Sequence, residues 1–423
     1  MSRRTRLLFV AVVLTAAIAW FAWFAWPLSV ATQVDAAIGR HDWAAATAGL
    51  DRLDRLQPAR SAHVLRRARI LRRQDRLADS IAAIDEAARL GHDAEEIRRQ
   101  RVLTVAQSGR IGEVEPEIRR LFGAAVDDAF AEECYEAIVK GYVACHRIDD
   151  ARQCVAFWRE WQPDNPRAQA AAGLVAEKLE LHGEAMAAFR RALSLAPHDV
   201  AVRGRVAAHE VYSGRLDVAA VEYARCLAEV PGDAGFLLGL ADCRLRLGEA
   251  DTATALLHDA LALDLTPGQE AVALTSLASL AAEARNTRDA IALYRDAVRL
   301  DARNITARFG LASALTGVGD EAAAATQLAE AQRLTAMHRR LTALTREAVG
   351  EPDNAELRVE IAGLLADLGF PDAGSRWLQT AAQVVSPRER TPAPSDRRAA
   401  GGERDERDEG SDTTHATHGR SDT

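Results

Sequence analysis

The chain has 423 residues, of which 48% are hydrophobic and 27% are charged, so it has enough apolar side chains for a large folded core. Its net charge is −8 and its pI is about 5.8, which excludes the basic surface typical of nucleic-acid binders, and we expect no nucleic-acid partner. Aromatic residues make up only 5%, and alanine and leucine are frequent throughout, which favours helices over strands.

Residues 1–6 form a basic N-terminus, and an uncharged apolar run follows them. Its most apolar part, Leu7–Trp26, has 20 residues and would span about 30 Å as a helix, the thickness of bilayer hydrocarbon. Tryptophan and phenylalanine side chains crowd its far end, as they do at membrane interfaces. We therefore expect residues 7–27 to form a transmembrane signal anchor.

The positive charge before this run predicts its orientation, because basic residues stay on the cytoplasmic side of a membrane. We expect a single-pass protein of the inner (plasma) membrane, with a cytoplasmic N-terminus and the rest of the chain periplasmic or otherwise extracytoplasmic. The alternative is a cleaved secretory signal, for which Ser29 and Ala31 provide a small-x-small cleavage site.

Five segments in the middle of the chain share one pattern, in which a small residue is followed four positions later by a large one and three positions after that by another small one. The triplets are Ala185/Phe189/Ala192, Ala219/Tyr223/Cys226, Ala253/Leu257/Ala260, Ala290/Tyr294/Ala297 and Ala324/Leu328/Ala331. Their first members lie 34, 34, 37 and 34 residues apart. The small residues let neighbouring helices approach closely, and the large residue fills the space between them.

A two-helix unit with this period resembles the tetratricopeptide-repeat family. Gly214, Gly248 and Gly319 are placed to end the first helix of a unit in a left-handed conformation, and Pro197 and Pro231 are placed to end the second. The resemblance implies an all-α, right-handed superhelical solenoid. It also implies a concave groove that is lined by the first helix of each pair.

Weaker copies of the pattern extend the array over residues 28–387, with roughly ten repeats of about 34 residues each. The repeat is degenerate near 94–126, where Pro116 predicts a late helix start or a kink. It is degenerate again near 336–352, where Ala336–Gly350 predicts an extension of the preceding helix. Residues 388–423 contain no large apolar side chain, and we expect them to be disordered.

The sequence contains none of the common catalytic motifs, such as a phosphate-binding loop, a nucleophile elbow or a zinc-protease helix. His209 and Glu210 begin a zinc-protease pattern but lack its second histidine, and His415 and His418 lie in the tail. We therefore predict no catalytic, cofactor-binding or metal-ligating residue, no small-molecule substrate and no enzymatic activity.

The five cysteines form no CxxC pair, and we interpret them as small buried hydrophobic residues. They are Cys134, Cys145, Cys154, Cys226 and Cys243. The alternative is one disulfide, either Cys226–Cys243 or Cys145–Cys154, which an oxidising compartment would permit.

By resemblance to the family, the groove is lined by the exposed faces of the first helices. The residues expected there are Glu133, Glu136, Lys140, Glu177, Lys178, Tyr212, Asp242, Arg246, Glu283 and Phe309. Some members of the family hold a peptide carboxylate with paired lysine and asparagine residues. The corresponding positions here are Glu136, Ala170, Gly204, Leu238, Thr275 and Phe309, so no such clamp is expected.

The resemblance therefore predicts an interaction scaffold that holds an unidentified protein or peptide segment in the groove, close to the membrane. The alternative is an accessory assembly factor for secreted, envelope or cytochrome proteins. An enzyme is the least favoured class, because the catalytic motifs are missing.

Overall fold

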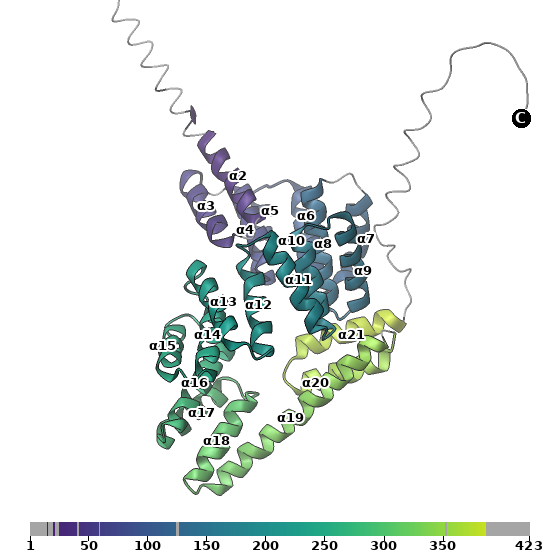
Figure 1. The fold of residues 1–423 in the computed structure, drawn as a ribbon. Helices are drawn as coiled ribbons and strands as arrows, with labels where there is room; N and C mark the ends of the chain where they lie inside the picture. Colours follow the sequence, from purple (N-terminus) through teal and green to yellow (C-terminus); the bar gives the residue numbers. More distant parts are fainter. Residues whose placement is uncertain are drawn as a thin grey trace, which may run out of the picture.

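The computed structural model describes residues 15, 20, 21, 25–39, 42–58, 60–123, 127–351 and 353–385. Within these residues all regular secondary structure is helical, and successive helices form ten packed pairs (Figure 1). The pairs are α2 (Trp26–Gly39) with α3 (Trp43–Leu56), α4 (Ser61–Arg73) with α5 (Leu77–Arg89), α6 (Ala94–Gln107) with α7 (Ile111–Gly123), α8 (Asp128–Ala144) with α9 (Ile148–Trp161), α10 (Pro166–Lys178) with α11 (His182–Leu195), α12 (Val200–Tyr212) with α13 (Leu216–Glu229), α14 (Ala234–Arg246) with α15 (Ala250–Leu261), α16 (Pro267–Glu283) with α17 (Thr287–Leu300), α18 (Ile305–Gly317) with α19 (Glu321–Gly350), and α20 (Ala355–Asp367) with α21 (Pro371–Val385).

The first helices of neighbouring pairs also contact one another. These contacts join α4 to α6, α6 to α8, α8 to α10, α12 to α14, α14 to α16 and α16 to α18. Second helices make no contacts of comparable extent with one another in the described part of the chain. The first helices therefore line the inner side of the superhelix, where successive pairs lie closest together.

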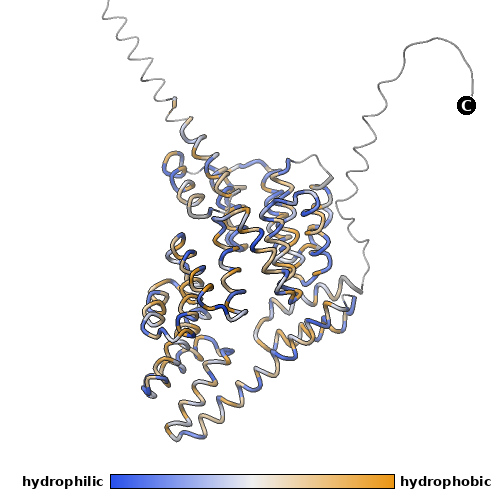
Figure 2. Tube along the Cα trace, in the orientation of Figure 1, coloured by the Kyte–Doolittle hydropathy of each residue, from blue (hydrophilic) through white to orange (hydrophobic). Residues whose placement is uncertain are grey.

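The series of inner contacts is interrupted between α10 and α12, and the chain turns there from the upper group of helices in Figure 1 to the lower one. We call α2–α11 the N-terminal repeats and α12–α19 the C-terminal repeats. Apolar and polar residues alternate along nearly every helix of both groups (Figure 2). This alternation is typical of helices that bury one face against their neighbours.

The small–large–small triplets are buried as the pattern predicts in four of the five repeats. The ring of Tyr223 lies over Gly239 on the next first helix, and the ring of Tyr294 lies over Gly310. A Cβ atom at either glycine would meet the ring at 2.6 or 2.3 Å, so no larger residue fits there. The aromatic residue of one pair thus packs directly against the backbone of the following pair.

In nine of the ten pairs the turn between the two helices contains a residue in the left-handed conformation, and the turn between α2 and α3 is only partly described. Gly214, Gly248 and Gly319 adopt it as predicted, with φ of +75°, +81° and +82°. Four other pairs have a larger residue at the same position, with φ between +57° and +60°: Asp75, His146, Glu180 and Arg285. A residue with a side chain is disfavoured in this conformation, so these four positions are unusual.

Helix α7 runs through Pro116, which lies in its interior. The helix begins at Ile111, so the proline does not delay the helix start. The other degenerate segment belongs to α19, a single helix of 30 residues that includes the extension expected over Ala336–Gly350.

The length of α19 changes how the last pair packs. Helix α20 lies against the second half of α19, where Leu344 and Ala348 share a core with Ile361 and Trp377. The first half of α19 therefore has no following pair over it. As a result Leu328, the large residue of the fifth triplet, is 40% exposed rather than buried as expected.

The second half of α19 leads back toward the N-terminal repeats (Figure 1). We call this half of α19, together with α20 and α21, the C-terminal arm. Trp377 of α21 stacks on His146, in the turn between α8 and α9, with ring centroids 4.0 Å apart. Arg346 of α19 forms an ion pair of 2.6 Å with Glu180, in the turn between α10 and α11. The C-terminal arm therefore contacts the N-terminal repeats, although the two are far apart in the sequence.

The prediction of a single-pass membrane protein is contradicted, because no helix in the described part of the chain is long and apolar enough to cross a bilayer. Most of the expected anchor, residues 7–27, lies outside the described residues. Helix α2 covers Trp26–Gly39 in the described part of the chain. Its buried residues, including Val30 and Val34, instead share a core with Leu50 and Leu53 of α3. The tail at 388–423 also lies outside the described residues.

Candidate partner-binding face

All ten residues predicted to line the groove lie on first helices, but the structure separates them into two groups. Those on α8 lie within the N-terminal repeats, where they are buried or half-buried. Those on α10, α12, α14, α16 and α18 are exposed or half-buried. The inner side is therefore filled at one end of the array and accessible at the other.

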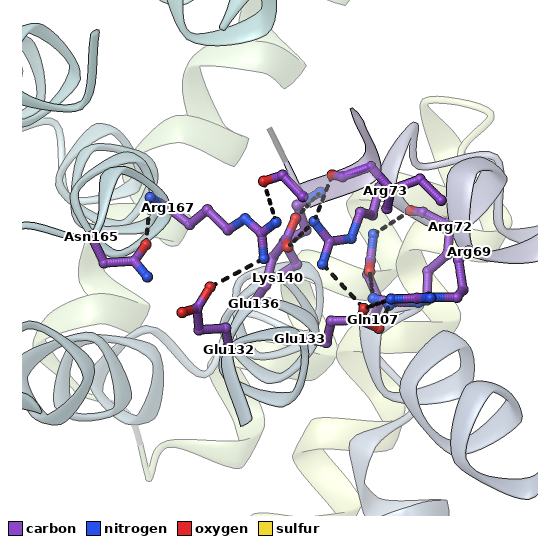
Figure 3. A network of polar contacts seen from close by, with 12 residues as sticks. Arg69, Arg72, Arg73, Gln107, Glu132, Glu133, Glu136, Lys140, Asn165 and Arg167 are labelled. Carbon is purple, nitrogen blue, oxygen red and sulfur yellow. Dashed lines mark hydrogen bonds and ion pairs between the residues drawn. The ribbon is translucent and has the colours of Figure 1, made fainter. Parts of the chain in front are cut away.

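The filled end is built around Glu133 of α8 (Figure 3). Its buried carboxylate accepts hydrogen bonds from Arg69 and, at 2.8 Å, from Arg72, and it lies 3.4 Å from the guanidinium group of Arg73. All three arginines come from α4, which faces α8 across the inner side. Arg72 has no exposed surface at all.

Further polar residues complete the network around this cluster. Glu136 lies 3.7 Å from Arg73, and Lys140 lies 3.6 Å from Glu136 and 3.2 Å from Asp75. Gln107 of α6 donates a 2.8 Å hydrogen bond to the main-chain carbonyl of Arg72. Each buried charge in the network thus lies beside a charge of the opposite sign, as buried charges require.

Burial by itself would raise the pKa of the Glu133 carboxyl, but the guanidinium groups of Arg69, Arg73 and Arg72 outweigh it and hold this pKa well below its usual range. The carboxylate is ionised at every physiological pH. Glu133 and Glu136 are therefore structural residues that pair within the chain, which corrects their assignment to an accessible groove.

Sequence reasoning missed the arginines of α4, because a helix rich in arginine reads as a solvated surface helix. The spacing of these arginines could have indicated that they lie on a buried face. Arg69, Arg72 and Arg73 are three and four residues apart, which places them on one face of a helix beside the buried Ala68.

At the accessible end, Tyr212 of α12 is 70% exposed and its ring lies 4.1 Å from that of His182. Arg246 and Asp242 of α14 form an exposed pair at 3.5 Å. The remaining predicted residues on this side are Glu177, which pairs with Arg205 at 2.8 Å, and the exposed Lys178 and Glu283. These side chains lie on a surface that solvent reaches.

Phe309 of α18 is 40% exposed and lines a pocket of about 540 Å³ between α18 and α19. The pocket is lined by Ile305, Phe309, Thr335, His338, Arg339, Thr342, Ala343 and Arg346. This lining combines apolar side chains with two guanidinium groups and one imidazole, and it includes no carboxylate. Arg339 is exposed, and no carboxylate pairs with it within the described residues.

The α19 side of this pocket was not predicted, because only first helices were expected to line the groove. It arises from the extension of α19 beyond the length of an ordinary second helix. Arg339 and Arg346 are seven residues apart, two helical turns, so both lie on the same face of α19.

The described residues contain no group of three histidine, cysteine or acidic side chains that could hold a metal ion. All five cysteines are buried and free, so neither of the disulfides considered from the sequence is formed. Burial raises the pKa of the Cys145 thiol to about 11 and that of Cys154 to about 12, which keeps both thiols protonated and unreactive.

Comparison with known protein families identifies the repeat. Residues 125–200 and 275–336 match one tetratricopeptide-repeat model, and residues 210–276 match another. These three ranges of the chain match tetratricopeptide repeats. The matched ranges include the first helices α8, α10, α14, α16 and α18.

Several solved structures are similar to this chain. Pseudomonas aeruginosa pilF is 17% identical, with a TM-score of 0.43, and the match covers 48% of this chain and 91% of pilF. PilW, a type IV pilus biogenesis factor, is also 17% identical with a TM-score of 0.43, over 49% of this chain and 94% of PilW. Human IFIT1 is 14% identical with a TM-score of 0.41, over 80% and 93% of the two chains. Comparison with curated proteins finds no match.

Proposed function

We propose that this tetratricopeptide-repeat protein is an interaction scaffold that holds a segment of a partner protein on the inner face of its C-terminal repeats. The observation that carries this proposal is the pocket between α18 and α19, which is lined by the exposed Phe309 and by two arginines. The exposed Tyr212 and Arg246 extend the same inner side along α12 and α14.

The pocket lining favours one kind of partner segment. A volume of about 540 Å³ lies in the range of ordinary ligand pockets and accommodates a large side chain. Guanidinium groups bind carboxylates through paired hydrogen bonds, and the lining offers Arg339, which is exposed, and Arg346, which pairs with Glu180 at 2.6 Å. The partner segment therefore presents an acidic side chain next to an apolar or aromatic one.

Two physical reasons favour this face over other surfaces. Stacked helices present a preformed surface, so binding there loses little conformational entropy. Tyrosine, arginine and other large aromatic side chains also contribute most of the binding energy in known interfaces, and this face exposes all three kinds. At the other end of the array the inner side is occupied by the Glu133 network.

A pull-down with matched baits tests the proposal. The baits are the full chain, a version that ends at Val385, and the full chain with Tyr212→Ala, Arg246→Ala and Phe309→Ala. The version without the tail should retain the partner, and the triple variant should lose it while its helix content and melting temperature stay unchanged.

A second triple variant serves as the control, with Val221→Ala, Arg299→Ala and Leu328→Ala. These residues are also exposed but lie on the second helices α13, α17 and α19. The control should retain the partner. Loss of the partner on removal of the tail, or equal loss in both triple variants, would place the binding site elsewhere.

A further inference from the structure

We propose that the contacts of the C-terminal arm with the N-terminal repeats form a latch, and that closure of this latch competes with partner binding in the pocket between α18 and α19. This inference rests on the proposed function, because the regulated surface is the proposed binding face. In this structure the latch is closed. A partner that binds in the pocket competes with closure.

The first contact of the latch is an aromatic stack. Trp377 of α21 is only 3% exposed, and its ring lies nearly parallel to that of His146, with an interplanar angle of 21°. Close packing continues beside the stack, since a Cβ atom at Gly109 would lie 3.4 Å from Cδ of Arg376. The arm therefore contacts the turns that end α6 and α8.

The second contact links closure to the binding face. Arg346 both lines the pocket between α18 and α19 and pairs with Glu180 of the N-terminal repeats. The side chains of both residues are at least half exposed, so the pair is weak and water competes for it. An acidic partner side chain would take the place of Glu180 at Arg346, and this competition makes partner binding and closure oppose each other.

The two residues that contact the arm occupy turn positions with a disfavoured backbone conformation, which Asp75 and Arg285 share. His146 and Glu180 occupy the left-handed turn position that is glycine in neighbouring repeats. A side chain at this position costs backbone energy that glycine would avoid. Both of these disfavoured side chains contact the arm.

The arm is also packed as a separate body. Trp377 belongs to a core formed by α19, α20 and α21 alone, and the core of the N-terminal repeats around Trp158 includes no residue of the arm. Between α21 and α5–α6 there remains a cavity of about 370 Å³, lined by residues that include Ala78, Val105 and Gln379. An interface with few apolar contacts and an unfilled cavity opens more readily than a continuous core.

Cross-linking of the full-length chain tests whether the latch closes in solution. Ala78 and Gln379 are exposed residues on opposite walls of the 370 Å³ cavity, so the variant Ala78→Cys/Gln379→Cys should be joined by a short bis-maleimide. The native cysteines are buried and will not compete. The matched control is Ala78→Cys/Leu378→Cys, because Leu378 is the exposed neighbour of Gln379 and does not line the cavity. Equal cross-linking of both pairs would overturn the proposal.

A second assay measures opening of the latch without any partner. Val105 is half-buried and lines the 370 Å³ cavity between α21 and α5–α6, so Val105→Cys should be labelled by a bulky polyethylene-glycol maleimide when the arm opens. Adding His146→Asn removes the aromatic stack but keeps a residue that tolerates the left-handed conformation. Labelling should become about two- to tenfold faster, the range expected for loss of one aromatic pair. The control His198→Asn changes a highly exposed histidine and should leave the rate unchanged.

A charge exchange provides a variant that does not depend on the stack. Arg346→Glu should speed the labelling of Val105→Cys, because two carboxylates then face each other, and adding Glu180→Arg should slow it again. An unchanged rate in both His146→Asn and Arg346→Glu would overturn the latch. If closure responds as expected but the partner binds to the Tyr212, Arg246 and Phe309 triple variant, the proposed function fails while the latch remains.

Discussion

The buried charges of Glu133 and of the three arginines on α4 show how single residues hold the N-terminal repeats together. A charge in the core is stable only while its partners are present, since each would otherwise lose its hydration without compensation. Arg72 is fully buried and depends on the carboxylate of Glu133 in this way. The identity of residue 133 thus affects the packing of α4, α6 and α8 together.

The first prediction concerns this carboxylate. Glu133→Gln should lower the free energy of unfolding by about 3–5 kcal/mol, because it leaves buried guanidinium groups without their counter-charge. The matched control is Glu177→Gln, whose pair with Arg205 is partly exposed and should contribute less than about 1 kcal/mol. Urea denaturation followed by circular dichroism measures both. Similar stability losses in the two variants would contradict the structural role of Glu133.

The second prediction concerns pH and His146. Burial, together with Lys178 of α10, Arg358 of α20 and Arg376 of α21, lowers the pKa of His146 to about 3 in the closed arm. When the arm opens, the imidazole regains an ordinary pKa of about 6.5, so the open state binds the additional proton. Closure is therefore fully stable above about pH 6.5 and weakens as the pH falls, by up to about 1.4 kcal/mol per pH unit.

Amide hydrogen exchange of α21 measures this effect. For each chain, the exchange rate is divided by the rate of the same chain at pH 7. As the pH is lowered from 7 to 5, this ratio should become larger in the native chain than in His146→Asn. The comparison at equal pH removes the intrinsic pH dependence of exchange. Parallel behaviour of the two chains over this range would contradict a neutral, buried His146.

At the scale of helices and repeats, the sequence predicted those buried positions that depend only on contacts within and between ordinary neighbouring pairs. The triplet spacing predicted buried residues such as Ala290 and Tyr294, because the same contacts recur in every ordinary pair. It failed at Leu328, since burial there requires a following pair over the first half of α19, and α20 packs on the second half instead. Local periodicity cannot report where a distant helix will pack.

The third prediction tests the repeat packing. Ala290 has no exposed surface and lies in the core of α16–α19, so Ala290→Asp should destabilise the chain by at least about 2 kcal/mol through an unpaired buried charge. Ala292→Asp, two residues along the same helix at an exposed position, should change stability by no more than about 0.5 kcal/mol. Thermal unfolding of the two variants distinguishes them. Equal melting temperatures would mean that the assigned repeat phase is wrong.

At the scale of the whole molecule, the course of the chain is set by contacts between residues far apart in the sequence. No periodic pattern relates His146 to Trp377 or Glu180 to Arg346, so the closure of the arm could not be predicted. The same limit explains why only part of the candidate site could be predicted from the sequence. Tyr212 and Phe309 followed from their place on first helices, whereas Arg339 lines the pocket with Phe309 only because α19 extends beyond its repeat.

The central claim is that a partner binds to the inner face of the C-terminal repeats, and hydrogen exchange of the chain with its captured partner tests it most directly. Protection on binding should be confined to α12, α14, α18 and the second half of α19, and exchange of α21 should become faster as the latch opens. The second helices α13, α15 and α17 should be unaffected. Protection of those helices, or of none of the array, would contradict the account.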